Sequence, residues 1–286
     1  MQSQIDVLST IDALDWVVFW GIAFVTIASV ALGHRRAQKQ LAGQTQASFL
    51  DHMLLGRALT LPMFVATIVA AWYGGIFGVT EISFSHGIYN FVTQGVFWYG
   101  AYIFFALFLA KSINESHAVT LPELVGMMFG PRAGKVAAVF NFFNILPVAY
   151  ALSMGLFIDT LFGVGLPTAI LIGTAIVVAY TMLGGFRAVV FSDIIQFGVM
   201  CSSVAAVLLF AVMTFGGIDF LRANLPETHF SPTGGQSLGT MFVWGLIAAA
   251  TLVDPSFYQR CLAAKSPRVA RNGIFVATVI WCLFDI

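Results

Sequence analysis

The sequence predicts an all-α protein, a polytopic bundle of helices that crosses a lipid bilayer. Of its 286 residues, 59% are hydrophobic and 9% are charged, whereas soluble globular domains carry about 25% charged residues. The mean hydropathy is +0.91. Apolar runs recur along the chain, and about 20 apolar residues in a helix span a hydrocarbon core of about 30 Å. This composition excludes an ordinary soluble enzyme and makes the lipid bilayer the expected surroundings.

Eight apolar segments reach or approach the spanning length. The first follows a stretch without the basic residues of a cleavable signal, so it is expected to remain as a helix. The last is still apolar at Ile286 and is too short to span, and Pro147 should kink the fourth. The segments are Leu14–Leu32, Leu61–Ser83, Asn90–Ala110, Val136–Leu156, Pro167–Leu183, Ala188–Phe215, Leu238–Val253 and a run that begins near Gly273.

The charges of the connecting loops predict the orientation. Cytoplasmic loops keep Lys and Arg, and a count over alternate loops leaves one basic residue, Arg222, on one side. The sequence therefore predicts a multi-pass protein of the cell membrane with its N-terminus outside the cytoplasm. Twelve basic residues are assigned to the inner side, namely Arg35, Arg36, Lys39, Arg57, Lys111, Arg132, Lys135, Arg187, Arg260, Lys265, Arg268 and Arg271.

One inner connection carries the signals of a helix start. Thr120 is followed by Pro122 and Glu123, and both proline and an acidic residue are favoured in the first turn of a helix. We expect a short helix that lies along the membrane surface.

The second segment contains three glycines within five positions, in Ala70-Ala71-Trp72-Tyr73-Gly74-Gly75-Ile76-Phe77-Gly78. An unwound turn here would free carbonyl oxygens that can coordinate a small cation. Alternatively, Gly74 and Gly78 form a small-residue seam for a neighbouring helix. Trp72 and Tyr73 lie beside the glycines, and their rings offer a cation–π surface to an organic cation.

The seventh segment ends in Thr251-Leu252-Val253-Asp254-Pro255. Pro255 removes a backbone donor and moves Asp254 away from helical angles, so the helix is expected to break before it resumes toward Arg260. Asp254 then either holds a cation or a proton beside the break, or caps the next helix in solvent.

Asp193 is a second acidic residue in an apolar segment. Membrane carboxylates usually face a polar cavity, so Asp193 is a candidate for an inner cation path. Alternatively, Asp193 and Gln196 form an N-cap pattern and Arg187 neutralises the carboxylate.

The chain shows no chemistry that predicts an enzyme, a cofactor or a nucleic-acid partner. Thirteen basic residues balance thirteen acidic ones, so no net charge favours nucleic acid. The sequence contains no Gly-rich phosphate loop, no His/Glu metal pair and no nucleophile with an adjacent base. Cys201, Cys261 and Cys282 lie in or beside apolar runs and lack the spacing of a zinc site or a disulfide framework.

Four stretches resemble the sodium:solute symporter family and occur in the family's order. The third and fourth are the most specific. The stretches are Met53-Leu54-Leu55-Gly56-Arg57, Ala70-Ala71-Trp72-Tyr73-Gly74-Gly75, Gly184-Gly185-Phe186-Arg187-Ala188-Val189-Val190-Phe191-Ser192-Asp193-Ile194-Ile195-Gln196 and Tyr258-Gln259-Arg260-Cys261-Leu262-Ala263-Ala264-Lys265-Ser266.

The resemblance implies a leucine-transporter-type fold with two inverted five-helix repeats. Residues 1–286 then form a single membrane domain, with an extra helix at 14–32, a first repeat at about 61–215 and the start of a second repeat at about 238–286. The eighth core helix of the family is absent from this sequence, so the second repeat is expected to be truncated.

The resemblance also implies site residues. Sodium is the expected coupling ion, held through carbonyls near Ala70 and Tyr73, with Asp193 on its inner route. The solute is expected close to Trp72, Gly74 and Gly75 on one side and Thr251 and Asp254 on the other. The second stretch is similar to choline-type members, yet Asp254 stands where those place an aromatic residue, so the substrate stays open.

The implied function is sodium-coupled symport of a small polar organic solute. Two alternatives are a membrane sensor that forms the input domain of a signalling kinase and an inactive truncated fragment.

Overall fold

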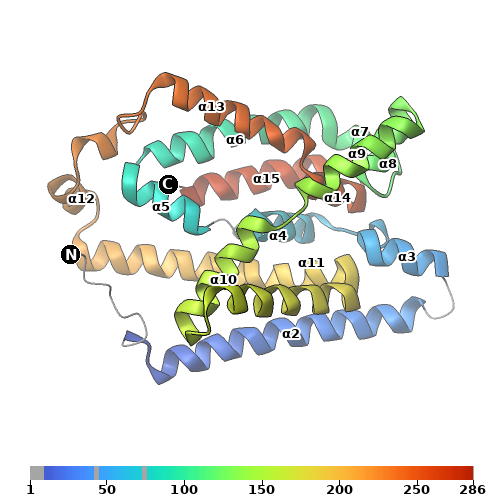
Figure 1. The fold of residues 1–286 in the computed structure, drawn as a ribbon, viewed down its shortest axis with the longest axis horizontal. Coiled ribbons are helices and arrows are strands. Elements are labelled where there is room, and N and C mark those ends of the chain that lie inside the picture. Colours follow the sequence, from blue (N-terminus) through green and yellow to red (C-terminus); the bar gives the residue numbers. More distant parts are fainter. Residues whose placement is uncertain (1–9, 42–44, 73–75, 286) are drawn as a thin grey trace.

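The computed structural model describes residues 10–41, 45–72 and 76–285, and within these ranges every regular element is a helix (Figure 1). One isolated parallel bridge joins Leu59 and Ala264. The prediction of an all-α bundle is therefore confirmed. The first half comprises α2 (Ala13–Leu41), α3 (Thr45–Leu54), η1 (Leu55–Arg57), α4 (Leu61–Trp72), α5 (Ile76–His86), η3 (Phe91–Val96), α6 (Phe97–Phe104), η4 (Phe105–Leu109) and α7 (Ala110–Glu115).

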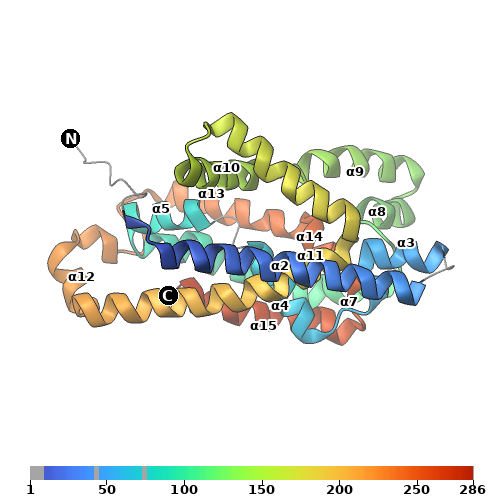
Figure 2. The same ribbon diagram turned by 90° about the horizontal axis from the view of Figure 1, so that it is seen from below.

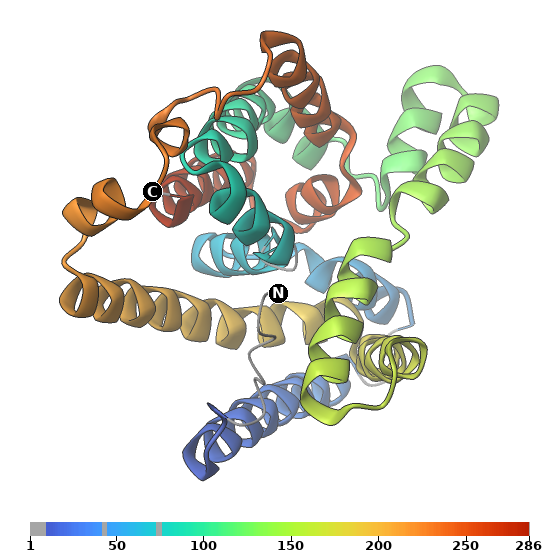
Figure 3. The same ribbon diagram turned by 60° about the vertical axis from the view of Figure 1, so that its left-hand side comes forward.

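The second half begins with the helical hairpin of α8 and α9, which projects from the rest of the bundle in Figure 3. Its elements are α8 (Leu121–Phe129), α9 (Pro131–Asn144), α10 (Val148–Phe162), α11 (Leu166–Phe215), α12 (Ile218–Asn224), η5 (Glu227–Phe230), α13 (Leu238–Ala248), η6 (Ala249–Val253), α14 (Pro255–Ala263) and α15 (Pro267–Asp285).

Five helices in the described ranges are long and apolar enough to cross a membrane. A sixth span is formed if α4 and α5 count as one, because these two helices are separated by a short break and bent by 61°. Many large apolar side chains on these helices are exposed, for example Val207, Leu208 and Phe210 on α11, as expected where lipid is the solvent. The five are Ala13–Arg35, Phe91–Glu115, Pro131–Phe162, Gly184–Phe215 and Leu238–Ala263.

The two segments expected at Pro167–Leu183 and Ala188–Phe215 are joined in α11. The chain turns back at Gly185, where φ is 58° and ψ is −157°, so the two halves of α11 form a V (Figure 2). The first half holds a shorter apolar helix, Leu166–Ala179. The last helix begins at Pro267 rather than Gly273, because it includes the basic residues that precede the apolar run.

The buried core lies where α4 meets the helices around α6, α14 and α15. Phe64, Phe105 and Trp281 are fully buried there, and the core also contains Leu262 and Ile274. Gly273 on α15 permits the close approach, since a Cβ atom at this position would lie 2.8 Å from Cε1 of Phe64. Thr67 on α4 and Arg260 on α14 lie next to residues of this core.

Loops assigned to the same side of the membrane lie at the same end of the bundle. Figure 1 shows α3, the α7–α8 region and the α14–α15 junction at one end, and α12 and the end of α5 at the other. The expected short helix is α8, whose N-cap residue Thr120 accepts a hydrogen bond from the Glu123 backbone N–H. The inverted repeats, the truncation and the outside N-terminus stay predictions.

Candidate ion and solute site

The second apolar segment bends where the glycines lie. The helices α4 (Leu61–Trp72) and α5 (Ile76–His86) differ in direction by 61°. Tyr73, Gly74 and Gly75 lie outside the described residues, so their expected roles stay predictions. Gly78 lies in α5, and a Cβ atom on it would meet no atom within 4 Å. Among the described residues, therefore, no helix packs against the Gly78 end of the proposed seam.

The seventh segment also breaks, at the position that Pro255 predicts. The helix α13 tightens into the 3₁₀ turn η6, and Asp254 then adopts extended angles before α14 begins. Oδ1 of Asp254 accepts a hydrogen bond from the backbone N–H of Ser256 at 2.7 Å. Asp254 therefore caps α14, and its expected role in holding a cation stays a prediction.

A third break, between α9 and α10, faces the break at Asp254. The helix α9 ends at Asn144 and α10 begins at Val148, with Pro147 between them as the expected kink. The two breaks share a cavity of about 400 Å³. Polar and aromatic side chains line it, among them Trp98, Asn144, Tyr150, Thr251, Asp254 and Ser256.

Trp72 lies apart from this cavity. It lines a smaller cavity of about 180 Å³ together with Thr80, Asn90 and Asp285. The ring of Trp72 lies 6.3 Å from that of Trp281. The structure therefore brings Thr251 and Asp254 together but places Trp72 in a different cavity.

Aromatic rings form a row between α4 and α14. The centroid of Tyr102 lies 4.6 Å from that of Trp281, which contacts Trp72, and 5.2 Å from that of Phe257 in the first turns of α14. The chain of rings runs from the break after α4 to the break before α14.

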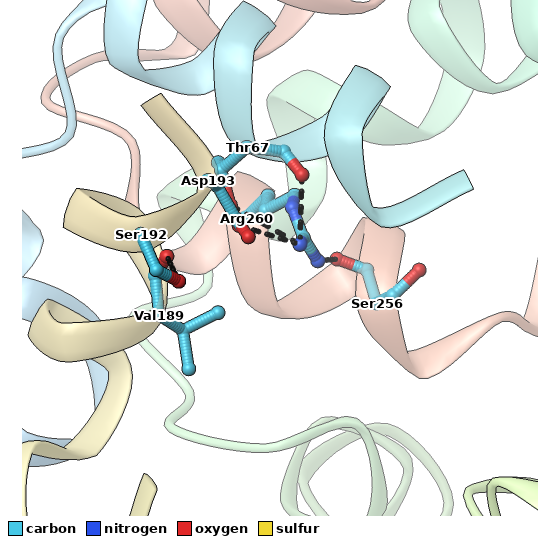
Figure 4. A network of polar contacts seen from close by, with 6 residues as sticks. All are labelled: Thr67, Val189, Ser192, Asp193, Ser256 and Arg260. Atoms are coloured by element: carbon cyan, nitrogen blue, oxygen red, sulfur yellow. Dashed lines mark hydrogen bonds and ion pairs between the residues drawn. The ribbon is translucent and has the colours of Figure 1, made fainter. Parts of the chain in front are cut away.

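Asp193 is buried on α11, at 7% exposure, and contacts α4 and α14 (Figure 4). The hydroxyl of Thr67 on α4 donates a hydrogen bond to Oδ2 of Asp193. Nη2 of Arg260 on α14 lies 3.8 Å from the same oxygen and donates to the Thr67 carbonyl at 3.0 Å. A buried carboxylate is thus held against the broken helix α4 by a hydroxyl and a guanidinium.

The alternative interpretation of Asp193 is wrong. Arg187 does not neutralise it, because the Arg187 guanidinium pairs with both carboxylate oxygens of Asp51 on α3. Asp193 also lies inside α11, eight residues beyond the turn at Gly185, and so caps no helix. The partner of Asp193 is Arg260, which the count of loop charges had placed in an inner loop but which is 4% exposed within α14.

Ala70 lies near this carboxylate. It is three residues after Thr67 on α4, hence on the same face of that helix. Ala70 and Gln196, which is three residues after Asp193, line one cavity of about 820 Å³ with mostly apolar walls. The structure therefore brings Ala70 and Asp193 to facing sides of α4 and α11.

Thr67 and Arg260 are site residues that the sequence alone did not reveal. Thr67 is a single hydroxyl in an apolar helix, for which packing is the usual explanation. Arg260 carries a usable signal, because it lies seven residues after Val253, the end of an apolar segment, and arginine is rare at membrane depth.

Three of the four stretches that carry the resemblance meet at one end of the bundle. The backbone N–H of Leu59 donates to the Ala263 carbonyl, and Lys265 donates back to the Leu59 carbonyl, both at 3.0 Å. Arg57 donates to the carbonyls of Leu262, His117 and Ala118. The third stretch lies close to them, because its Arg187 pairs with Asp51, two residues before the first stretch.

The chain is similar to known transporters. The model of the sodium:solute symporter family matches residues 52–286. The chain is 22% identical to high-affinity choline transporter 1 of Caenorhabditis elegans, over 92% of this chain and 46% of that protein. It is 26% identical to the sodium/glucose cotransporter of Vibrio parahaemolyticus, over 96% of this chain and 53% of that protein.

A third relative is the sodium/pantothenate symporter of Haemophilus influenzae, 26% identical over 58% of this chain and 37% of that protein. The chain thus spans about half the length of the curated relatives it matches, or less. The family match covers most of the chain and includes the convergent stretches, so the chain belongs to the sodium:solute symporter family.

Proposed function

We propose that the protein is a sodium-coupled symporter that carries a small polar organic solute across the cell membrane. The observation that carries this proposal is Asp193, a buried carboxylate held against an interrupted membrane helix with one ion-pair partner in the described part of the chain. Family membership and relatives named for choline, pantothenate and glucose transport support it.

Sodium binding is assigned to the break between α4 and α5. Carbonyls near Ala70 and Tyr73 would coordinate the ion, since an interrupted helix leaves backbone oxygens without helical partners. Asp193 would draw the ion inward, because a carboxylate in a low-dielectric setting attracts a cation strongly. Sodium entry supplies about 2.3 kcal/mol per 100 mV of membrane potential, in addition to its concentration gradient.

The solute is assigned to the cavity between the breaks at Pro147 and Pro255. Its volume of about 400 Å³ fits a small organic molecule. Thr251 and Asp254 offer a hydroxyl and a carboxylate there, and Trp98 and Tyr150 offer aromatic faces. Trp72, with Gly74 and Gly75, would contribute from the break after α4. Transport needs no covalent step, so we do not expect an enzyme.

The test of this function is sodium-dependent uptake by the full-length protein in proteoliposomes. Under an inward sodium gradient, we expect accumulation of at least one labelled solute among choline, pantothenate and glucose, and loss of accumulation when potassium replaces sodium. Uptake that is unchanged in potassium contradicts sodium coupling.

Replacing Asp254 with asparagine should remove the negative charge of this side chain and keep its role as the helix cap of α14. Asparagine caps helices about as well as aspartate, so α14 should stay folded. Loss of the carboxylate should raise the solute concentration for half-maximal uptake about tenfold, which corresponds to about 1.4 kcal/mol. Initial uptake rates over a range of solute concentrations measure the change.

The matched control is Asp12→Asn. Asp12 also accepts backbone hydrogen bonds at a helix start, from Leu14 and Asp15, but it lies at the beginning of α2, on none of the elements that line the solute cavity. It should leave the half-maximal concentration unchanged. If Asp254→Asn does the same, Asp254 serves only as a cap.

A further inference from the structure

Arg260 links the carboxylate Asp193 to the wall of the solute cavity. Its side chain points back along α14, as helical side chains do, and Nη1 donates to the Ser256 carbonyl at 3.1 Å. Nη2 reaches α4, where it donates to the carbonyl of Thr67 at 3.0 Å and to its hydroxyl oxygen at 3.2 Å. One buried guanidinium therefore contacts two helices (Figure 4). These are α4, which precedes the first break, and α14, which follows the break at Asp254.

The guanidinium is close to Asp193 without being locked onto it. The pair of Arg187 and Asp51 shows a locked arrangement, with Nε 2.9 Å from Oδ2 and a second bond to Oδ1. Arg260 instead lies 3.8 Å from Asp193, and the Thr67 hydroxyl occupies the same carboxylate oxygen. Nε of Arg260 is buried and has no hydrogen-bond partner in the described part of the chain.

A cation that reaches Asp193 must compete with this guanidinium. Asp193 and Arg260 are both more than nine-tenths buried, and charges in such surroundings interact more strongly than in water. A sodium ion beside Asp193 places a second positive charge next to Arg260, whose other neighbouring carboxylate, Asp254, caps the first turn of α14. Occupancy by the ion therefore favours withdrawal of the guanidinium.

Withdrawal of the guanidinium would change the wall of the solute cavity. Ser256, whose carbonyl holds Nη1, and Asp254, which caps the same turn, both line that cavity. The other end of the guanidinium holds the carbonyl of Thr67 on α4. A shift of Arg260 thus acts on both interrupted helices at once.

We propose that Arg260 is a tethered cation that replaces the coupling ion at Asp193 and thereby positions the first turn of α14 at the solute cavity. The proposal rests on the proposed symport. When sodium leaves, Arg260 neutralises Asp193, which allows the empty carrier to return. When sodium is present on both sides, the loaded carrier can exchange solute without that step.

The test compares Arg260→Gln with the wild type in the full-length protein. Binding of radioactive sodium to purified protein should become at least about fivefold tighter, the lower end of typical coupling between sites, because the competing cation is gone. Sodium-driven net uptake of the solute that the wild type carries should fall about tenfold or more. Exchange of labelled solute, with sodium and solute on both sides, should persist.

A purely structural role predicts a different result. In that case net uptake and exchange fall together and sodium binding is unchanged or weaker, which would overturn the proposal. Should Arg260→Gln not fold, Arg260→Lys carries the same test. Lysine keeps the charge but has only one nitrogen to donate hydrogen bonds to the carbonyls of Thr67 and Ser256. Net uptake by this variant should therefore lie between those of the wild type and Arg260→Gln, and exchange should be intact. Equal loss of both overturns the proposal.

Arg57→Gln is the matched control. Arg57 also donates to buried carbonyls, those of Leu262 and Ala118, but it has no contact with Asp193. It should lower stability and leave the sodium affinity unchanged. A wild type without sodium-dependent uptake would instead reject the proposed function itself, so the two failures are distinguishable.

Discussion

Replacing Asp193 with asparagine is expected to abolish sodium-driven uptake. Asparagine is nearly isosteric and can accept the Thr67 hydrogen bond, but it removes the negative charge that attracts the ion. Removing one partner of a buried ion pair costs about 3–5 kcal/mol. A free-energy loss of this size in sodium binding lowers the sodium affinity at least about 100-fold. Initial uptake rates and radioactive sodium binding by the full-length protein measure the effect.

Asp51→Asn is the control for the loss of a buried carboxylate. Asp51 is 6% exposed and is paired with Arg187, so its replacement should destabilise the protein to a similar extent. It lies outside the network of Thr67, Asp193 and Arg260, and sodium dependence should persist in the protein that folds. Normal sodium-driven uptake by Asp193→Asn would remove Asp193 from the ion path.

Replacing Gly185 with alanine is expected to prevent stable folding. The angles of Gly185, φ 58° and ψ −157°, fall in a region that is essentially restricted to glycine and costs other residues about 1–3 kcal/mol. A Cβ atom there would also lie 2.5 Å from the His52 carbonyl oxygen. The turn between the two halves of α11 would have to change. The packing of α3 against this turn would have to change with it.

Thermal unfolding and size-exclusion chromatography of the purified protein measure this effect. The control is Gly198→Ala on the same helix, where a Cβ atom would meet no atom within 4 Å. Alanine is favoured over glycine in a helix by up to about 1 kcal/mol, so this variant should be at least as stable as the wild type. A Gly185→Ala protein with the wild-type melting temperature would show that the turn tolerates a side chain.

Local sequence signals predicted the helices and most of their interruptions. Long apolar runs identified the spans, the glycines after Trp72 marked the bend between α4 and α5, and the prolines at positions 147 and 255 marked where helices end. These signals act through the backbone of the residues that carry them, because proline removes a donor and glycine weakens a helix. They therefore need no knowledge of distant parts of the chain.

Partners across the bundle could not be predicted in the same way. Arg187 is closer to Asp193 in sequence than Arg260 is, and it was the natural partner to expect. The turn at Gly185 carries Arg187 to Asp51 instead, while the break before α14 brings Arg260 against Thr67 and Asp193. Likewise, Trp72 and Asp254 appeared as one solute site, and the structure separates them into two cavities.

The sequence by itself determined that this protein is a helical membrane bundle of the sodium:solute symporter family and where its helices break, because hydropathy and backbone preference are properties of contiguous residues. Only the tertiary structure decided which basic residue pairs with which acidic residue. That choice depends on side-chain distances between helices that are far apart in the chain, and Arg260 and Asp193 are more than sixty positions apart.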